Sequence, residues 1–159
     1  MNIKIDYSYI NELKNILDNN KDKRICVVGT SCTGKTTYLE YAKNGLDMDK
    51  VIFPLLSKEE KEYVCQTPWT PEIGQTMDKL VRERIKIQVG QPVFGTVVID
   101  CDLIVYLNIS EELLKKRTKS RNVNFDDAKG MQDGIEKELS KTTIPVIIID
   151  VKEKELERD

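Results

Sequence analysis

Gly29-Thr-Ser-Cys-Thr-Gly34-Lys35-Thr36 matches the pattern G-x-x-x-x-G-K-[ST], in which each fixed position has a physical task. Glycine permits backbone turns that bring several N–H groups to one concave side, where they can bind phosphate oxygens. We expect Lys35 to contact the β- and γ-phosphates of a nucleoside triphosphate, and the Thr36 hydroxyl to coordinate Mg²⁺. The predicted nucleotide-binding residues are Gly29, Thr30, Ser31, Cys32, Thr33, Gly34, Lys35, Thr36 and Thr37.

The residues on either side of this segment have the order that such a loop requires. Arg24-Ile-Cys-Val-Val28 is a short apolar run rich in β-branched residues, which is typical of a buried parallel strand. Residues 37–43 predict a helix that ends at Asn44-Gly45. The order of strand, loop and helix favours a phosphate-binding loop over an accidental glycine-rich turn.

The remainder of the chain alternates expected helices with expected strands. Helices are predicted over 8–19, 57–65, 75–89, 110–121 and 132–141, with a polar loop over 122–130. Strands are predicted over 51–56, 94–99, 103–107 and 144–150. This alternation predicts one α/β domain over 1–159, a three-layer αβα sandwich around a mainly parallel sheet of about five strands.

Composition narrows the function classes. The chain has 159 residues, 40% hydrophobic and 33% charged, with a net charge of −2, which describes a globular protein without a basic surplus. We therefore expect neither nucleic acid nor a membrane as a partner. No apolar run is long enough to cross a bilayer, and the N-terminus lacks the apolar core of a secretion signal, so a cytoplasmic location is expected.

The chain contains no histidine and four scattered cysteines. The usual zinc sites and the Ser-His and Cys-His nucleophiles are therefore excluded. Cys32 lies inside the predicted loop, where an inert thiol is favoured over an oxidation-sensitive one.

A nucleotide loop of this kind needs a carboxylate at the end of a neighbouring strand to hold Mg²⁺. Val97-Val-Ile-Asp100 has the expected form, three apolar residues followed by aspartate. Asp102 is the alternative, and Asp100 is preferred because it follows the apolar run directly. The predicted metal ligands are Thr36 and Asp100.

Residues 101–117, Cys-Asp-Leu-Ile-Val-Tyr-Leu-Asn-Ile-Ser-Glu-Glu-Leu-Leu-Lys-Lys-Arg, together with Arg121, resemble the distal half of nucleoside and nucleotide kinases. The resemblance covers 25–37, 96–121 and 146–150. It implies a short lid around 117–130, with Arg117 near the base or phosphates of ATP and Arg121 neutralising the transferred phosphoryl group. Guanidinium groups suit this role because they can donate two parallel hydrogen bonds to phosphate. With Lys35, these arginines are the predicted catalytic residues.

An acceptor-binding region is expected around 57–92. Lys79, Arg82 and Lys86 recur at helical spacing and could bind an anionic acceptor, although a solvated basic stripe explains them equally well. Trp69 could stack on a base or anchor its loop, and Glu72 could orient a hydroxyl group.

These features predict an ATP- and Mg²⁺-dependent kinase that phosphorylates a nucleoside, a nucleotide or a related metabolite. The alternative is a nucleotide-binding module or weak NTPase, including a degenerate kinase, that acts through a partner. A GTPase is disfavoured because the chain has no Asn-Lys-x-Asp motif. The sequence does not decide whether the protein forms a homodimer.

Overall fold

A computed structural model describes residues 3–4, 8–41, 44–68, 70–152 and 154–155. The chain folds around a five-stranded sheet whose strands lie in the order β3-β4-β2-β5-β6, and every pair is parallel. The strands are β2 (Ile25–Val28), β3 (Leu46–Asp47), β4 (Val93–Gly95), β5 (Leu103–Ile109) and β6 (Val146–Val151). The α/β class and the parallel sheet are therefore confirmed.

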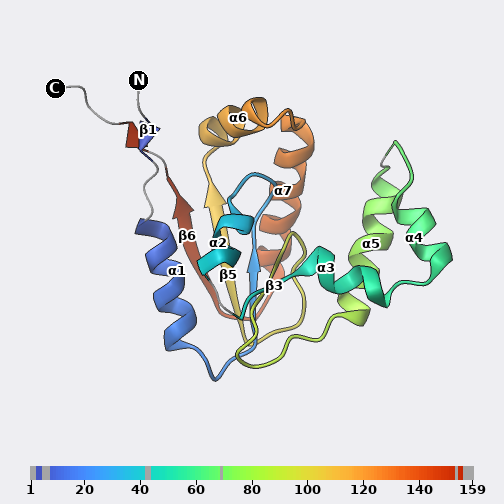
Figure 1. Ribbon diagram of the computed structural model, residues 1–159, viewed down its shortest axis with the longest axis horizontal. Helices are drawn as coiled ribbons and strands as arrows, with labels where there is room; N and C mark the ends of the chain where they lie inside the picture. Colours follow the sequence, from blue (N-terminus) through green and yellow to red (C-terminus); the bar gives the residue numbers. More distant parts are fainter. Residues whose placement is uncertain (1–2, 5–7, 42–43, 69, 153, 156–159) are drawn as a thin grey trace.

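The helices are α1 (Ser8–Asn19), α2 (Lys35–Tyr41), α3 (Met48–Ile52), α4 (Lys58–Val64), α5 (Pro71–Arg84), α6 (Glu111–Ser120) and α7 (Phe125–Lys141). A 3₁₀ turn, η1 (Phe53–Leu55), follows α3. Two short strands, β1 (Ile3–Lys4) and β7 (Lys154–Glu155), pair in antiparallel orientation beside the two chain ends (Figure 1). None of the helices in the described ranges is both long enough and apolar enough to cross a membrane.

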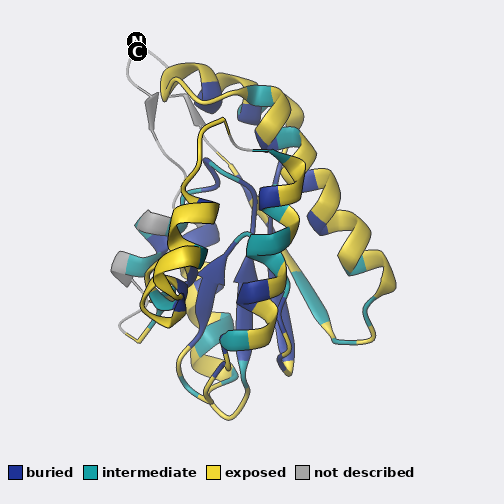
Figure 2. Ribbon diagram, turned by 90° about the vertical axis from the view of Figure 1, so that its right-hand side faces the viewer, coloured by how far each residue is buried: buried dark blue, intermediate teal, exposed yellow. Residues whose placement is uncertain are grey.

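Two hydrophobic clusters cover the two faces of the sheet, because successive strand residues point to opposite sides. On β5, Leu103, Val105 and Leu107 pack with α1 and α2, whereas Ile104 and Tyr106 pack with α5 and α7. Figure 2 shows the buried strands between helices whose outer surfaces are exposed. This alternation explains why β5 reads as a continuous apolar run in the sequence.

Several predicted elements are confirmed, two are wrong, and the strand predicted over 94–99 and the helix predicted over 75–89 end early, at Gly95 and Arg84. The Ser57–Glu60 capping box begins α4, with Ser57 Oγ accepting from the Glu60 N–H and the Glu60 carboxylate accepting from the Ser57 N–H. The strand predicted over 51–56 is instead the end of α3 followed by η1, because Met48 and Ile52 lie one helical turn apart and both are buried. Along the chain, the strand of the five-stranded sheet that follows β2 is the two-residue β3.

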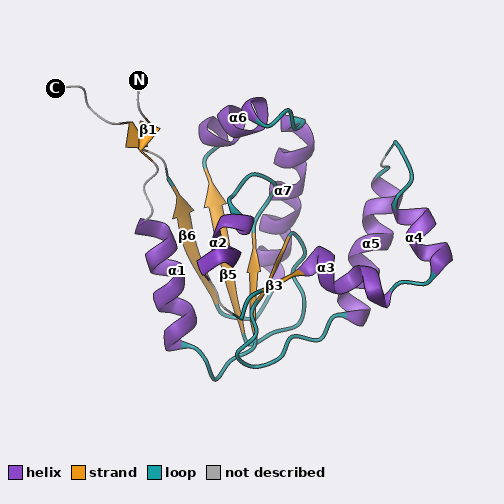
Figure 3. Ribbon diagram, viewed as in Figure 1, coloured by secondary structure: helices purple, strands orange, loops and turns teal. Residues whose placement is uncertain are grey.

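The loop predicted over 122–130 is mostly helix. Asn124 accepts a hydrogen bond from the Asp127 N–H and starts α7 at residue 125. Only residues 121–124 separate α6 from α7, and Figure 3 shows this short loop at the top of the two helices. The predicted lid around 117–130 is therefore a compact helical hairpin.

The α4 and α5 helices lie to one side of the sheet, and Figure 1 shows them at the right, apart from α1 and α2. Arg84 of α5 joins these helices through a bidentate contact with Glu60, in which Nη2 lies 2.6 Å from Oε2. Arg84 also donates to the Leu55 carbonyl. The predicted acceptor region thus forms a helical unit joined by one half-buried ion pair.

Candidate functional site

The loop of residues 29–36, called here the 29–36 loop, connects the carboxyl end of β2 to the start of α2. Cys32 and Gly34 have positive φ angles of 67° and 88°, so the backbone turns sharply twice within three residues. The carboxyl ends of parallel strands meet at this edge, which is where ligands of open α/β sheets bind. The side chain of Thr36 lies outside the described set, and its metal role stays a prediction.

Gly29 brings the loop into close contact with the neighbouring strands. Its N–H donates to the Gly95 carbonyl at the end of β4, at 3.2 Å. A Cβ atom at this position would lie 2.9 Å from Thr33 Oγ1 and 3.0 Å from the Cβ of Leu107 on β5. The first glycine of the motif is therefore required by packing between β4 and β5.

Lys35 folds back into the 29–36 loop. Its Nζ atom lies 2.7 Å from the Gly29 carbonyl oxygen and 2.7 Å from that of Thr30, and donates to both. Burial lowers the pKa of Lys35 to about 8, and the nearby Asp49 carboxylate opposes this shift. The structure thus holds a half-buried ammonium group inside the loop, where an anion would interact with it more strongly than at the open surface.

Helices α6 and α7 also contact the 29–36 loop. Arg117 of α6 is buried, and its Nη1 donates to the Cys32 carbonyl at 2.9 Å. The buried Thr30 hydroxyl donates to the Ala128 carbonyl in the first turn of α7, at 2.5 Å. The structure therefore brings Arg117 to the 29–36 loop, and its predicted contact with ATP stays a prediction.

Arg121 lies at the C-cap of α6 and is exposed. Its backbone N–H donates to the Arg117 carbonyl at 3.0 Å, so the two arginines lie one helical turn apart at the C-terminal end of α6. Its predicted contact with a transferred phosphoryl group stays a prediction.

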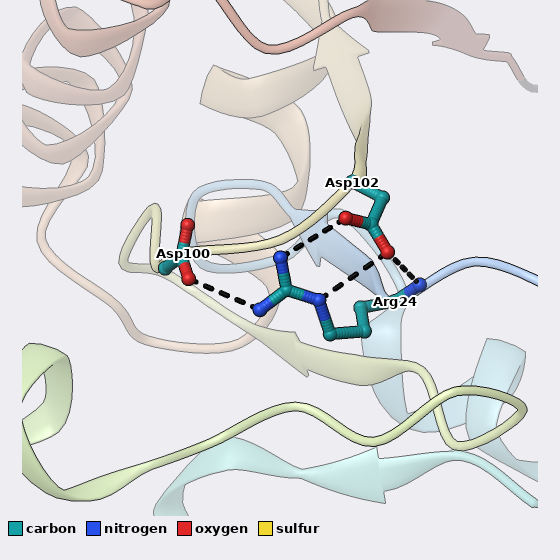
Figure 4. A network of polar contacts seen from close by, with 3 residues as sticks. All are labelled: Arg24, Asp100 and Asp102. Atoms are coloured by element: carbon teal, nitrogen blue, oxygen red, sulfur yellow. Dashed lines mark hydrogen bonds and ion pairs between the residues drawn. The ribbon is translucent and has the colours of Figure 1, made fainter.

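The prediction that Asp100 lies beside the 29–36 loop is wrong. Asp100 and Asp102 both bind the guanidinium of Arg24, at 3.0 Å each, and Figure 4 shows Arg24 between the two carboxylates. Arg24 precedes β2 and Asp102 precedes β5, so this network lies at the amino edge of the sheet, opposite the loop. The chain leaves β4 at Gly95 and returns to the amino edge through 96–102 without a helix.

The hydrogen bonds of this network shift the pKa values of Arg24 and Asp102. Hydrogen bonds to Asp102 and Asp100 raise the pKa of Arg24, and the hydrogen bond from Arg24 lowers the pKa of Asp102. Both carboxylates contact a cation of the chain itself. Their role is to fasten the start of β5 to the start of β2.

The carboxylates that the structure does bring near Lys35 are Asp47 and Asp49. Asp47 ends β3, and its Oδ1 accepts from the Asp49 N–H at 3.0 Å, which caps α3. Burial raises the pKa of Asp49, as does Asp47, whereas Lys35 lowers it. The sequence signal that could have located them is the N-cap pattern of Asp47 before Met48 and Ile52.

The predicted acceptor residues have the following places. Arg82 Nε donates to the Val98 carbonyl at 3.3 Å, and its Nη2 lies 3.6 Å from Glu138 of α7, so it links α5 to the core. Lys79 lies 4.0 Å from Glu83 on the same helix.

The other predicted acceptor-binding residues have these positions. Glu72 is exposed in the first turn of α5, and Lys86 is exposed just after the end of this helix. Trp69 lies outside the described residues.

Among the described residues, no group of three or more acidic or cysteine side chains is arranged to hold a metal ion. No known family model matches this chain, and no curated protein matches its sequence.

Proposed function

We propose that this protein is an ATP-dependent kinase that transfers the γ-phosphoryl group to a nucleoside, a nucleotide or a related small metabolite. One observation supports the proposal most strongly: the half-buried Lys35 ammonium donates to carbonyl groups within the 29–36 loop while Arg117 of a separate helix contacts the same loop. Two cations from segments about 80 residues apart in the chain converge on one backbone turn.

Lys35 is proposed to exchange its contacts with the Gly29 and Thr30 carbonyls for phosphate oxygens when a nucleotide binds. The exchange is favourable because a desolvated ammonium gains more from an anion than from two neutral carbonyl groups. Arg117 keeps the Cys32 carbonyl turned away from the phosphates, so that the loop N–H groups face the ligand.

Magnesium would be held by the Thr36 hydroxyl, by nucleotide oxygens and by water, with Asp49 or Asp47 within reach. Oxygen ligands are those that Mg²⁺ prefers, and the ion commonly uses only one or two protein carboxylates beside the phosphates. A site of that kind agrees with the absence of a larger acidic cluster in the described part of the chain. The bound ion would neutralise charge on the phosphates.

The residues of the chain then carry out positioning and charge neutralisation, which dominate phosphoryl transfer. An acceptor oxygen forms a bond to the γ-phosphorus as the bond to the bridging oxygen of ADP breaks. A proton from an acceptor hydroxyl passes to a carboxylate, for which Asp49 and Asp47 are the candidates at this edge.

The competing proposal is a nucleotide-binding module without an acceptor. The short 121–124 connection favours it, because a helical hairpin this tight offers little chain to close over a substrate. The loop over 96–102, which Arg24 fastens at the amino edge, likewise leaves no helix between β4 and β5.

The deciding experiment is ADP formation from ATP or GTP with Mg²⁺ across a panel of nucleosides and nucleotides. The kinase proposal expects turnover only with particular acceptors, and its loss in Lys35→Ala. Nucleotide binding without acceptor-dependent turnover would favour the binding module. Failure to bind any nucleotide would overturn both proposals.

A further inference from the structure

A cavity of about 360 Å³ lies between α1, α2 and the amino edge of the large sheet. Its described lining includes no residue of the 29–36 loop. The apolar part of the wall consists of Ile10, Leu13, Leu17, Ile25, Tyr38 and Pro92. Its size falls within the range of small-molecule sites, and its aliphatic walls are typical of them.

The cavity results from how α1 meets the sheet. Ile10 and Leu13 of α1 are buried against Ile25 at the start of β2, whereas Leu17, one turn further, is only half-buried. Beyond it the chain turns away through residues 20–23. The apolar surface that this turn leaves uncovered would gain free energy from an aliphatic ligand.

Three exposed lysines, Lys14, Lys21 and Lys23, stand around the opening. Asp18 is the acidic residue in the described lining, so the charge at the opening is positive. The chain as a whole carries a net charge of −2, which makes this local surplus of cations a feature of the cavity rather than of the surface in general. A ligand with a negative head group would be attracted here.

Tyr38, which lines this wall, has a buried hydroxyl group. It is buried, its ring lies edge-on to Tyr9 at 5.3 Å, and its hydroxyl has no hydrogen-bond partner among the described residues. Burial raises the pKa of Tyr38, so the hydroxyl stays protonated and can donate. A buried donor of this kind gains free energy from any acceptor that reaches it.

We propose that this cavity binds a small amphipathic anion, with an aliphatic body between α1 and β2 and a carboxylate at Lys14, Lys21 and Lys23. The proposal goes beyond the nucleotide site and does not depend on it. Tyr38 connects the two regions in the chain, because it lies on α2, the helix that begins at Lys35.

The test uses decanoate as the probe, below its micelle concentration, and follows methyl NMR signals of Ile10, Leu13, Leu17 and Ile25. A ligand of this size is expected to bind with a dissociation constant on the order of 1 mM. Decanol, which has the same chain without the charge, is expected to bind roughly tenfold more weakly. No nucleotide is needed, so the result is independent of the proposed kinase activity.

Two variants separate the contributions of charge and shape. Lys14→Glu/Lys21→Glu/Lys23→Glu should weaken decanoate binding roughly tenfold and leave decanol binding unchanged. Lys58→Glu/Lys61→Glu/Lys137→Glu is the matched control, with the same change in net charge at exposed positions on α4 and α7. Leu17→Trp, at a half-buried position, should fill the cavity and abolish binding of both probes.

The proposal is overturned if decanoate moves no cavity methyl signal at saturating probe. It is equally overturned if both triple variants bind decanoate alike, or if the decanoate shifts map to exposed residues such as Leu55 and Ile148. Circular dichroism melting curves confirm that each variant is folded before its binding is compared.

Discussion

The guanidinium of Arg117 donates to the carbonyl oxygen of Cys32 at 2.9 Å, and this bond joins α6 to a loop 85 residues earlier in the chain. Cys32 has a φ angle of 67°, a conformation that non-glycine residues rarely adopt. The buried guanidinium therefore holds the carbonyl of a backbone turn that local preference does not favour. Arg117 therefore helps to position the 29–36 loop.

Replacing Arg117 by methionine should lower both stability and nucleotide affinity. The Cys32 carbonyl would lose its buried partner, which costs about 1–3 kcal/mol of the free energy of unfolding. Urea denaturation measures the stability and isothermal titration calorimetry the ATP affinity. Lys119→Met, at an exposed position on the same helix, is the control and should change neither quantity.

The Mg²⁺-dependent binding of ATP should require Asp49 and not Asp100. Asp49→Asn is expected to reduce Mg²⁺-dependent ATP binding about tenfold or more, because it removes a carboxylate near Lys35 while leaving the Asp47 cap of α3 in place. Asp100→Asn should leave that binding unchanged, since Asp100 lies at the opposite edge with Arg24. Titrating Mg²⁺ at fixed ATP measures the effect of each variant. A larger loss of binding in Asp100→Asn than in Asp49→Asn would contradict this assignment of carboxylates.

The sequence predicts those elements whose signal is local. The β2 and β5 strands are continuous apolar runs, and the Ser57–Glu60 capping box lies within four consecutive residues. The 29–36 loop is recognised for the same reason, because its glycines and lysine are close together in the chain. Each of these patterns carries its own physical cause.

The parts that the sequence did not predict depend on distant partners. Asp100 and Asp102 looked like strand-end carboxylates, but Arg24, which lies 76 and 78 residues away, fixes them at the amino edge. Met48 and Ile52 are held in a helix by burial on the sheet, which overrides the β-branched composition of that segment. The strand that ends beside Lys35 has only two residues, too few for any periodicity.

Stability at alkaline pH should report the buried state of Lys35. Its pKa is about 8 when folded and 10.5 as an ordinary lysine, so between these values the unfolded chain binds more protons. The contribution of Lys35 to the free energy of unfolding therefore rises with pH across this window, by at most about 3 kcal/mol. The measured quantity is the difference in the free energy of unfolding between the native protein and Lys35→Met. Tyrosines and cysteines titrate in both proteins, so their contribution cancels in this difference. A pH-independent difference would mean that the ammonium is not desolvated.

Acid should weaken the ion pair between Glu60 and Arg84 that joins α4 to α5. Contact with Arg84 lowers the pKa of Glu60 to about 2 from 4.5, so the stability that this pair contributes is present above pH 4.5 and is lost as the pH falls towards 2. Glu60→Gln should therefore be less stable than the native protein at neutral pH, and the difference should shrink below pH 4.5. Glu59→Gln, an exposed neighbour in the same first turn, serves as the control and should show no such trend.

Two glycine-to-alanine changes should act in opposite directions. Gly29→Ala would place a Cβ atom 2.9 Å from Thr33 Oγ1 and 3.0 Å from Leu107 Cβ, so the loop must move away from β5, at a cost of about 1–3 kcal/mol. Gly134→Ala lies within α7 with no atom near the added methyl group, and should stabilise the protein by about 0.5–1 kcal/mol. Urea denaturation of both variants and the native protein measures these changes. Only the first should also weaken ATP binding, because the displaced Gly29 carbonyl is one of the two that hold the Lys35 ammonium in place. Equal stability of the two variants would mean that the 29–36 loop does not pack against Leu107 as described.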